Sequence, residues 1–418
     1  MISRVSIAAL AAAGVMLSSA SAQAADLGGD CCADLEERVA TLEATTARKG
    51  NRKVSLTIYG QVNHALMAWD NGRDSDAYIV DNDNSSSRFG FKGKAKINSD
   101  WSAGYKIEIE VESASSVSVD ENQDDGQGTP ALRKSFLYIK SKTFGKLSLG
   151  QNSVATDDLS HDTQTSGTSK FVQPDIRYGR DFNLINTAGG NVGTEWGQLC
   201  GAAVADGDQC FDIGGRQDSV RYDTPSIAGF KLSAAWGEND YWDVAARYKG
   251  KFDQFKIGAG VGYSVWDGQD AGALAEETSF VASASIMHTP TGLFVNGAYR
   301  NNEVDFGATS QEMDAYYVQV GVKQKWNSLG ATTIWADYMN AQDGLLTGED
   351  RNQLFGGNVA TSSEYDRFGF GVAQNIDAAK MQLYVIYQHN EAEIETVAGA
   401  VDGIEDFDVV VAGGIIRF

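Results

Sequence analysis

Histidine and cysteine, from which many catalytic and metal sites are built, are scarce in this sequence. The chain has 418 residues but only four of each. The histidines (His64, His161, His288 and His389) are far apart, and neither an HExxH nor a GxSxG motif occurs. A GAGVG segment at 258–262 lies in a predicted strand and lacks the spacing of a dinucleotide-binding loop. We therefore expect no enzyme, no metal site and no cofactor.

An excess of positive charge is also missing. The chain has 34 Lys and Arg against 56 Asp and Glu, and its formal net charge is −22 at pH 7. Proteins that bind nucleic acids need Lys and Arg to replace the counterions of the phosphate groups. We therefore expect no nucleic-acid partner.

Long apolar runs are absent after the N-terminus. Residues 1–24 contain a positive start at Arg4, an apolar stretch and the small residues Ala22-Gln23-Ala24. This is the pattern of a secretory signal peptide. Its apolar stretch is shorter than the roughly 20 residues of a membrane-spanning helix. We predict that residues 1–24 are a cleaved signal peptide and that Ala25 is the first residue of the mature chain.

The four cysteines form two pairs in the sequence. Cys200 and Cys210 lie ten residues apart in a Gly-rich segment, and export places them in an oxidising compartment. We predict a disulfide between them, because the alternative, a zinc site, lacks a nearby His and the usual ligand spacing. The other two, Cys31 and Cys32, are adjacent near the mature N-terminus.

These adjacent cysteines begin DCCADLEERVATLEATTARKG (30–50), the only stretch typical of a charged amphipathic helix. Leu35, Val39 and Leu42 have the four-and-three spacing of a coiled coil. So short a coiled coil does not fold alone, but attachment to a trimer would raise the local concentration of its helices. We predict that 25–52 is a periplasmic helical extension and linker, with Cys31 and Cys32 as candidates for cross-links between subunits. The alternative is a frayed, mobile extension.

Proline is rare as well, with four residues against 46 glycines, which favours sheet over loop-rich disorder. After residue 53, apolar and polar residues alternate with a period of two. In 101–113, one face carries Tyr105, Ile107, Ile109 and Val111, and the other carries Lys106, Glu108, Glu110 and Glu112. Such alternation indicates a sheet with one apolar and one polar face.

A soluble sandwich alternates in the same way, but three features favour a transmembrane barrel. The chain carries an export signal, its strands are about 10–15 residues long, and short links alternate with long polar loops. We predict an all-β fold, a 16-stranded antiparallel transmembrane β-barrel over 53–418 with a short N-terminal periplasmic helix. The predicted strands are 53–69, 86–98, 101–115, 131–142, 145–152, 217–225, 229–239, 241–251, 255–266, 276–288, 292–303, 312–326, 329–341, 363–375, 379–392 and 405–418.

Two segments of this pattern are unusual. The last strand is apolar on both faces between Val409 and Ile416, and we expect burial against a neighbouring barrel as the cause. The DNDNS segment at 81–85 is similar to the first half of a calcium loop but lacks its later Gly and Glu. We expect it to be a solvated loop.

Several segments resemble the strands of bacterial general porins: SSSRFGFKG (85–93), RKSFLYIKSKTFGKLSLGQNS (133–153), DSVRYDTPSIAGF (218–230) and the terminal Phe418. The start of the mature chain, from Gly28 to Asp70, is similar to the alphaproteobacterial, rhizobial-type porin family. This resemblance implies a homotrimer in the bacterial outer membrane, in contact with its lipids and lipopolysaccharide. It also implies passive diffusion of ions and small hydrophilic solutes through a pore narrowed by the third extracellular loop.

The sequence itself singles out one loop, 153–216, as by far the longest connection, and such loops are usually functional. Constrictions in wide barrels select solutes by diameter and charge. By analogy with general porins, we expect Asp157, Asp158 and Asp162 of this loop to oppose the wall residues Arg88, Arg133 and Arg221 at the narrowest point. The strand period argues against an inward Arg133, because Leu137 and Ile139 would then also point inward.

Two further expectations follow from the resemblance and the charge. Some members of the family are joined to peptidoglycan through a mature N-terminus that begins Ala-Asp, as Ala25-Asp26 would here. The alternative function is therefore a structural tether between outer membrane and peptidoglycan, with an incidental or substrate-specific pore. The net acidity and the three loop acids predict a mild preference for cations.

Overall fold

The computed structural model describes residues 53–125, 130–203, 207–208, 210–238, 240–267, 276–305, 310–345, 360–396, 399–401 and 403–418. The predicted signal peptide and N-terminal helix, with Ala25, Cys31 and Cys32, lie outside the described residues. No helix within the described ranges is long and apolar enough to cross a membrane.

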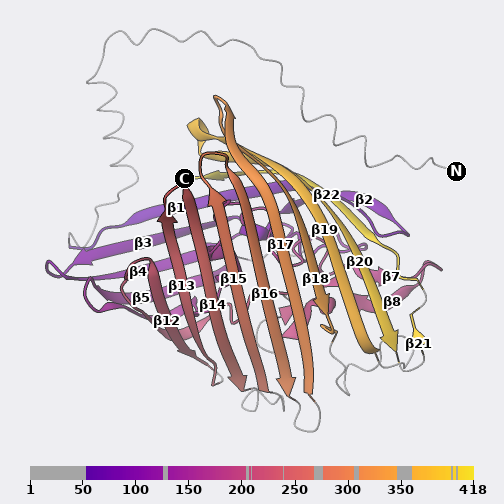
Figure 1. Ribbon diagram of the computed structural model, residues 1–418, viewed down its shortest axis with the longest axis horizontal. Coiled ribbons are helices and arrows are strands. Elements are labelled where there is room, and N and C mark those ends of the chain that lie inside the picture. Colours follow the sequence, from indigo (N-terminus) through magenta and orange to yellow (C-terminus); the bar gives the residue numbers. More distant parts are fainter. Residues whose placement is uncertain are drawn as a thin grey trace.

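Sixteen long strands of the described chain form one closed antiparallel barrel, as predicted (Figure 1). The barrel closes where β1 pairs with β22, for example at Ala65 and Gly413. The strands in order are β1 (Thr57–Asp70), β3 (Arg88–Lys96), β4 (Trp101–Glu110), β5 (Ala131–Ser141), β6 (Gly145–Ser153), β11 (Arg216–Asp223), β12 (Phe230–Gly237), β13 (Trp242–Phe252), β14 (Phe255–Asp267), β15 (Glu276–His288), β16 (Leu293–Asp305), β17 (Ser310–Asn327), β18 (Gly330–Gln342), β19 (Ala360–Ile376), β20 (Met381–Thr396) and β22 (Phe407–Arg417).

The second strand of the wall begins earlier than predicted. A further strand, β2 (Ser75–Asp81), pairs with the second half of β1, while β3 pairs with the first half. The segment between them, with the short 3₁₀ helix η2 (Asp83–Ser85), interrupts this wall strand. The expectation of a solvated loop at 81–85 was wrong, because Asn82 and Asn84 are buried. The Asn82 side chain caps η2 and donates hydrogen bonds to the hydroxyls of Tyr178 and Tyr384, both at 2.8 Å.

The two faces of the wall have the predicted polarity. Ile107 of β4 is 38% exposed on the outer surface, whereas the neighbouring Glu108 is only 4% exposed and points inward. Large apolar side chains are likewise exposed outside on the other strands, such as Leu137 on β5 and Val318 on β17. An apolar outer face and a polar inner face are the arrangement that a lipid-embedded barrel requires.

A β-bulge resolves the conflict over Arg133. Glu108 pairs with Lys134, but the next residue, Ile109, pairs with Leu132, so Arg133 is an extra residue in the ladder. The extra residue shifts the alternation by one position. Arg133 and Lys134 therefore both point inward, while Leu137 remains on the outer face.

The strands are joined by short turns at one end of the barrel and mostly by longer loops at the other, as predicted. The short turns are 97–100, 142–144, 224–229, 253–254, 289–292, 328–329 and 377–380, and the last of these includes the 3₁₀ helix η6 (Asp377–Ala379). In Figure 1 the C-terminus lies at this end. At the opposite end 71–74 and 238–241 are also short, whereas 111–130, 154–215, 343–359 and 397–406 are long.

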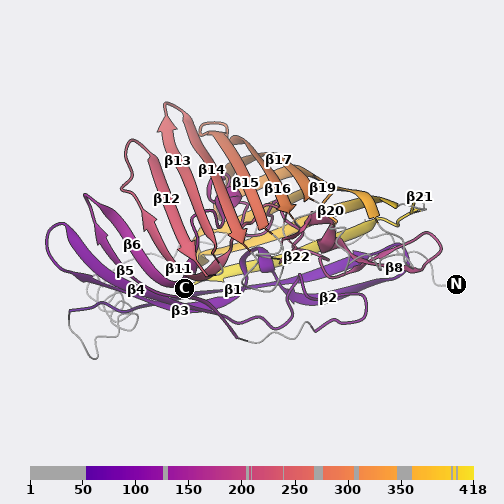
Figure 2. The ribbon, with the colours of Figure 1, turned by 90° about the horizontal axis from the view of Figure 1, so that it is seen from below.

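Loop 154–215, between β6 and β11, runs inside the barrel. It contains α2 (Leu159–Asp162), β7 (Asn183–Ile185), β8 (Asn191–Glu195), the 3₁₀ helix η3 (Trp196–Cys200), β9 (Ala202–Ala203) and β10 (Gly207–Asp208). One more short strand, β21 (Gly399–Ala400), pairs with β20. In Figure 2 segments of the loop lie between the two sides of the wall.

The loop fills one side of the lumen with an apolar core. Phe171 stacks on Trp335 of β18 and Tyr384 of β20, and Phe182 packs on Trp69 of β1 and Phe407 of β22. Val409 and Val411 of β22 belong to this same buried cluster. The last strand is therefore apolar on its inner face because the loop covers it, and the neighbouring barrel that we expected is not needed to explain its pattern.

Candidate pore constriction

Two arginines of the wall hold the start of loop 154–215. Arg221 of β11 donates hydrogen bonds to the carbonyl oxygens of Ser153 (3.0 Å) and Val154 (2.6 Å). Arg247 of β13 does the same for Ala155 (2.5 Å) and Asp157 (2.9 Å). Each guanidinium has several donors in a fixed plane and can satisfy two carbonyl groups at once. The path of the loop into the barrel is thereby fixed by side chains of the wall.

A third arginine holds the middle of the loop. Arg367 of β19, which is fully buried, donates hydrogen bonds to the carbonyl oxygens of Asp175 (2.8 Å) and Gln173 (2.9 Å). Its charge is balanced by Asp337 of β18, at 3.3 Å. The loop also bonds to the interrupted second wall strand, since the Gln173 amide donates to the carbonyl oxygen of Asn84 at 2.8 Å. The loop is thus attached to the wall on opposite sides of the lumen.

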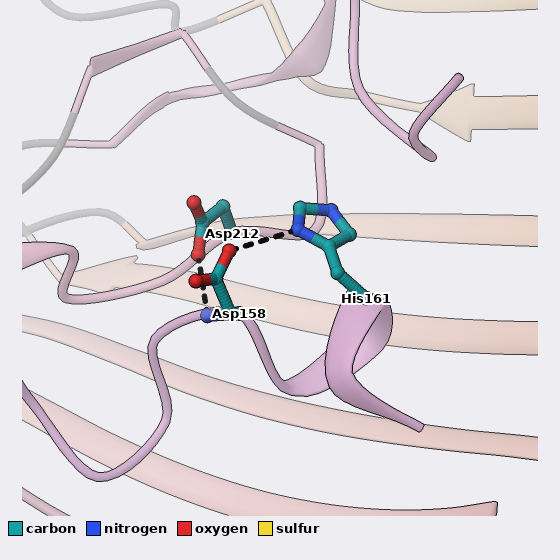
Figure 3. A group of neighbouring side chains, drawn as sticks. All are labelled: Asp158, His161 and Asp212. Carbon is teal, nitrogen blue, oxygen red and sulfur yellow. Dashed lines mark hydrogen bonds and ion pairs between the residues drawn. The ribbon is translucent and has the colours of Figure 1, made fainter. Parts of the chain in front are cut away.

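A histidine near the start of the loop contacts two of its acids, Asp158, which Figure 3 shows, and Asp175. His161 Nδ1 lies 3.1 Å from Asp158, and its Nε2 lies 3.2 Å from Asp175. The Asp158 backbone N–H in turn donates to the Asp212 carboxylate at 3.1 Å. Burial alone would lower the pKa of His161, but the hydrogen bonds and charges of Asp158 and Asp175 outweigh burial and raise it to about 10. His161 is therefore an imidazolium that donates from both nitrogens at neutral pH.

The three acids expected at the constriction differ in exposure. The side chains of Asp158 and Asp162 are 46% and 55% exposed and are available to solutes in the lumen. Asp157 is only 3% exposed, and neither oxygen of its carboxylate has a hydrogen-bond partner among the described residues. Burial, together with the nearby charges of Asp158 and Asp212, raises the pKa of Asp157 to about 7. Asp157 is thus a weaker source of negative charge than the sequence suggests.

The wall formed by β3, β4 and β5 carries a cluster of cations around two glutamates. Glu108 is 2.9 Å from Lys106 Nζ, 3.5 Å from Arg133 Nε and 4.0 Å from an Arg88 nitrogen. Arg133 is also paired with Glu110. Lys134 Nζ donates to the Ser153 hydroxyl at 2.7 Å, where the wall meets the start of the loop. Arg88 and Arg133 thus lie in one inward-facing cluster.

Arg221 has different surroundings. It is 9% exposed, lies 2.9 Å from Asp223 and donates to the two loop carbonyls described above. This environment favours a role in holding the loop. Sequence reasoning passed over Lys106 and Lys134, although the alternation that places Glu108 inside also places Lys106 there. With Leu137 and Ile139 outside, the alternation also places Lys134 inside. Only Arg133 needed knowledge of the bulge, which no local sequence signal revealed.

Asp158, His161 and Asp212 are close enough for one atom of each to reach a common metal ion, since these atoms lie within 4.8 Å of one another. However, a metal ligand must have a deprotonated nitrogen. Both nitrogens of His161 face carboxylates within this loop, and Arg177 lies 3.7 Å from Asp175. The arrangement is that of an ion-pair network that stabilises the loop.

A disulfide joins Cys200 and Cys210, whose Cα atoms are 4.6 Å apart, and the predicted pairing is confirmed. Both cysteines are fully buried, and Cys200 is the last residue of η3. Trp196 of η3 packs on Tyr365 and Phe407, and Phe211 packs on Tyr317. The bond therefore connects two parts of the loop that contact different strands.

An inward loop held across a closed barrel is the architecture of a channel, and the comparisons agree. A model of the Gram-negative porin family matches residues 7–395. The chain belongs to this family. No curated protein matches it. A porin is a channel of the outer membrane, so the family and the fold together give this chain its location and its class of activity, which is transport and not catalysis.

Solved structures share the fold of this porin at low sequence identity. The anion-selective porin from Comamonas acidovorans has a TM-score of 0.59 and 15% identity, covering 87% of this chain and 100% of that one. The outer-membrane expressed OmpT of Vibrio cholerae has a TM-score of 0.52 and 16% identity, covering 88% and 99%. Salmonella typhi OmpF, solved in complex with daunomycin, has a TM-score of 0.51 and 15% identity, covering 88% and 99%.

Proposed function

We propose that this porin lets ions and small hydrophilic solutes diffuse passively between loop 154–215 and the cationic wall of β3 to β6. One observation carries the proposal. The apolar core of the loop occupies the side of the lumen next to β16–β20, β22 and β1, whereas Asp158 and Asp162 are exposed on the loop and Lys106, Arg88 and Arg133 face the lumen. Water and solutes therefore have a polar route on one side only.

In this proposal the constriction is formed by Asp158 and Asp162 on one side and by Arg88, Lys106 and Arg133 on the other. Opposite charges on facing sides produce a field across the path, which orients dipolar solutes and holds water. Arg221 and Asp157 support the constriction through the backbone of the loop, because both are almost fully buried.

We also propose that the chain is a homotrimer. Vibrio cholerae OmpT, whose fold is similar, has been solved in a trimer form, and the sequence resemblance to general porins points the same way. The rhizobial-type affiliation, the peptidoglycan contact and the subunit cross-links through Cys31 or Cys32 stay predictions. Cross-links would appear as covalent dimers on denaturing gels without reductant, lost in a Cys31→Ala/Cys32→Ala variant.

The test is single-channel recording of the purified full-length protein in planar bilayers, together with swelling of liposomes in sugars of increasing size. We expect three coupled conductance steps per inserted trimer and swelling rates that fall smoothly with solute size. A barrel without conductance would contradict the proposal. Saturable uptake of one solute, with exclusion of others of equal size, would instead indicate a specific channel.

A further inference from the structure

The GAGVG segment at 258–262 is the surface on which the start of loop 154–215 rests. Its three glycines, Gly258, Gly260 and Gly262, occupy alternate positions of β14 and share the inner face of the wall. On this face β14 has no side chains over three successive inward positions. Glycine within a strand weakens it, and often marks a place where another backbone approaches closely.

Each of these glycines contacts the loop. A Cβ atom at Gly258 would overlap the carbonyl oxygen of Thr163. At Gly260 it would lie 3.1 Å from the side chains of Leu159 and Thr163, and at Gly262 it would lie 2.7 Å from the side chain of Thr156. None of the three has a left-handed backbone, so an L-residue would fit the strand itself. The contact with the loop is therefore what requires glycine here.

Polar groups next to the glycines complete this contact. Ser283 and Ser285 of β15 pair with Gly260 and Gly258 in the sheet. The Ser283 hydroxyl donates to the carbonyl oxygen of Leu159 at 3.1 Å and accepts from the Thr163 hydroxyl at 2.9 Å. The Ser285 hydroxyl accepts from the backbone N–H of Thr165 at 2.9 Å. Together, the two serines and the glycines hold residues 159–165 flat against the wall.

The contact between β14 and the loop matters for transport because the loop segment that makes it carries the acids of the constriction. Residues 159–163 include α2, which carries His161 and Asp162, and Asp158 directly precedes it. The distance of these acids from the cationic wall across the lumen thus depends on how closely α2 lies on β14. We propose that the glycine row Gly258, Gly260 and Gly262 positions the constriction, so that the absence of side chains at these three residues sets the width of the pore. This inference rests on the proposed diffusion function.

The decisive variant is Gly258→Val. Its side chain meets the backbone of Thr163, and non-bonded atoms need about 3.5 Å or more, so the loop must recede by roughly 1 Å or more toward the opposite wall. The matched control is Ala259→Val, which enlarges the next residue of the same strand on the outer face. We expect a lower single-channel conductance and slower entry of larger sugars for Gly258→Val, and wild-type values for Ala259→Val.

A second pair of variants guards against a failure of Gly258→Val to fold. In Gly260→Ala the added methyl meets two atoms of the Leu159 side chain and one of Thr163, and Leu159→Ala removes the two Leu159 atoms. We expect the conductance of Gly260→Ala to fall below wild type and that of the Gly260→Ala/Leu159→Ala double variant to return toward it. No side-chain truncation would restore Gly258→Val, because its contact is with backbone.

The outcomes separate this inference from the function on which it rests. If the wild type does not conduct, the diffusion function itself fails. If the wild type conducts and folded Gly258→Val and Gly260→Ala have the same conductance and size limit, only the positioning role is overturned. An equal loss of conductance in Ala259→Val would also overturn it, because the effect would then come from the strand and not from its contact with the loop.

Discussion

At the scale of single residues, burial decides which charges of this porin meet solute. Glu108 is 4% exposed and is surrounded by three cations, whereas Asp162 has more than half of its side chain in the lumen. Nothing in the sequence next to Glu108 or Asp162 indicates that one is buried and the other exposed. Their different roles follow from the bulge at Arg133 and the path of loop 154–215, neither of which a period of two can predict.

The face assignment of β5 gives the first prediction. Leu137 is 59% exposed on the outer surface, and the adjacent Tyr138 points into the lumen. A lysine at the bilayer midplane costs about 2–4 kcal/mol, so Leu137→Lys should fold into lipid vesicles with a markedly lower yield than Tyr138→Lys. The yield is measured from the fraction of heat-modifiable barrel on gels. Equal yields for the two variants would contradict the face assignment.

The buried ion pair of Arg367 and Asp337 gives the second prediction. Neither side chain is exposed, and Arg367 also holds the carbonyls of Gln173 and Asp175. Arg367→Met leaves a buried carboxylate without its partner, which costs about 3–5 kcal/mol. We expect a clear drop in the temperature at which the folded band is lost.

The control for this effect is the double variant Arg367→Met/Asp337→Asn, which removes the unpaired charge but leaves the loop carbonyls without donors. It should recover much of the thermal stability, while its channel current should remain noisier than wild type. Equal thermal stability of the single and double variants would show that the carboxylate is not the source of the loss.

At the scale of elements, the sequence predicts the wall strands well and the structure inside the barrel poorly. Alternation located all sixteen wall strands, because each has one face in lipid and one toward the lumen. It missed β2, because the interruption at 82–87 is stabilised by distant residues. Asn82 contacts Tyr178, 96 residues away in the chain, and Tyr384, 302 residues away. The alternation also did not reveal that the loop covers the apolar inner face of β22.

The ion-pair network of α2 gives a third prediction, on pH. The pKa of His161 is raised to about 10 in the folded protein, against an ordinary value of 6.5. Protonated His161 therefore contributes stability that is complete below about pH 6.5, declines as the pH rises, and is lost above about pH 10. The groups that face it are Asp158 and Asp175, with Arg177 beside Asp175.

We therefore expect His161→Gln to be less stable than wild type at pH 6, with the difference shrinking steadily between pH 6.5 and 10. The measurement is the midpoint of urea unfolding for both proteins at each pH. Asp175→Asn, which removes one of the two acceptors, should show a smaller pH dependence than wild type. A difference that stays constant up to pH 10.5 would show that His161 does not act as a cation in this network.

At the scale of the whole molecule, the net charge of −22 is distributed unevenly. On β15–β20 and β22 the outward side of the described barrel carries acids near the long-loop end: Glu276, Glu303, Asp305, Glu312, Asp314, Glu364, Asp366, Glu391, Glu393, Glu395 and Asp408. The inner face of β3–β6 and β11–β13 instead carries cations: Lys92, Lys94, Lys96, Lys106, Lys134, Lys140, Lys146, Arg221, Lys231, Arg247 and Lys249.

This separation argues against the cation preference that we expected from the sequence. A solute in the lumen is near the inner cations, while the outer acids are on the far side of the wall and screened by salt. The acids that oppose these eleven inner cations are fewer. They are Asp158 and Asp162 on the loop and Glu108, Glu110, Asp223 and Asp243 on the inner face of the wall. We therefore predict a net preference for anions, which would appear as the sign of the reversal potential in a gradient of potassium chloride.

Two matched variants test whether the local or the total charge decides. Lys92→Gln/Lys94→Gln removes two exposed cations from the inner face, and Glu303→Gln/Glu393→Gln removes two exposed acids from the outer face. In 0.1 M salt, where charges are screened over about 10 Å, the first should shift the reversal potential toward cations and the second should leave it unchanged. If total charge governed selectivity, the outer variant would shift it toward anions by a similar amount. A different result would contradict this prediction, namely a wild type that prefers cations and an inner variant with an unchanged reversal potential. In that case Asp158 and Asp162 determine the ion selectivity, and the lysines of the wall do not affect it.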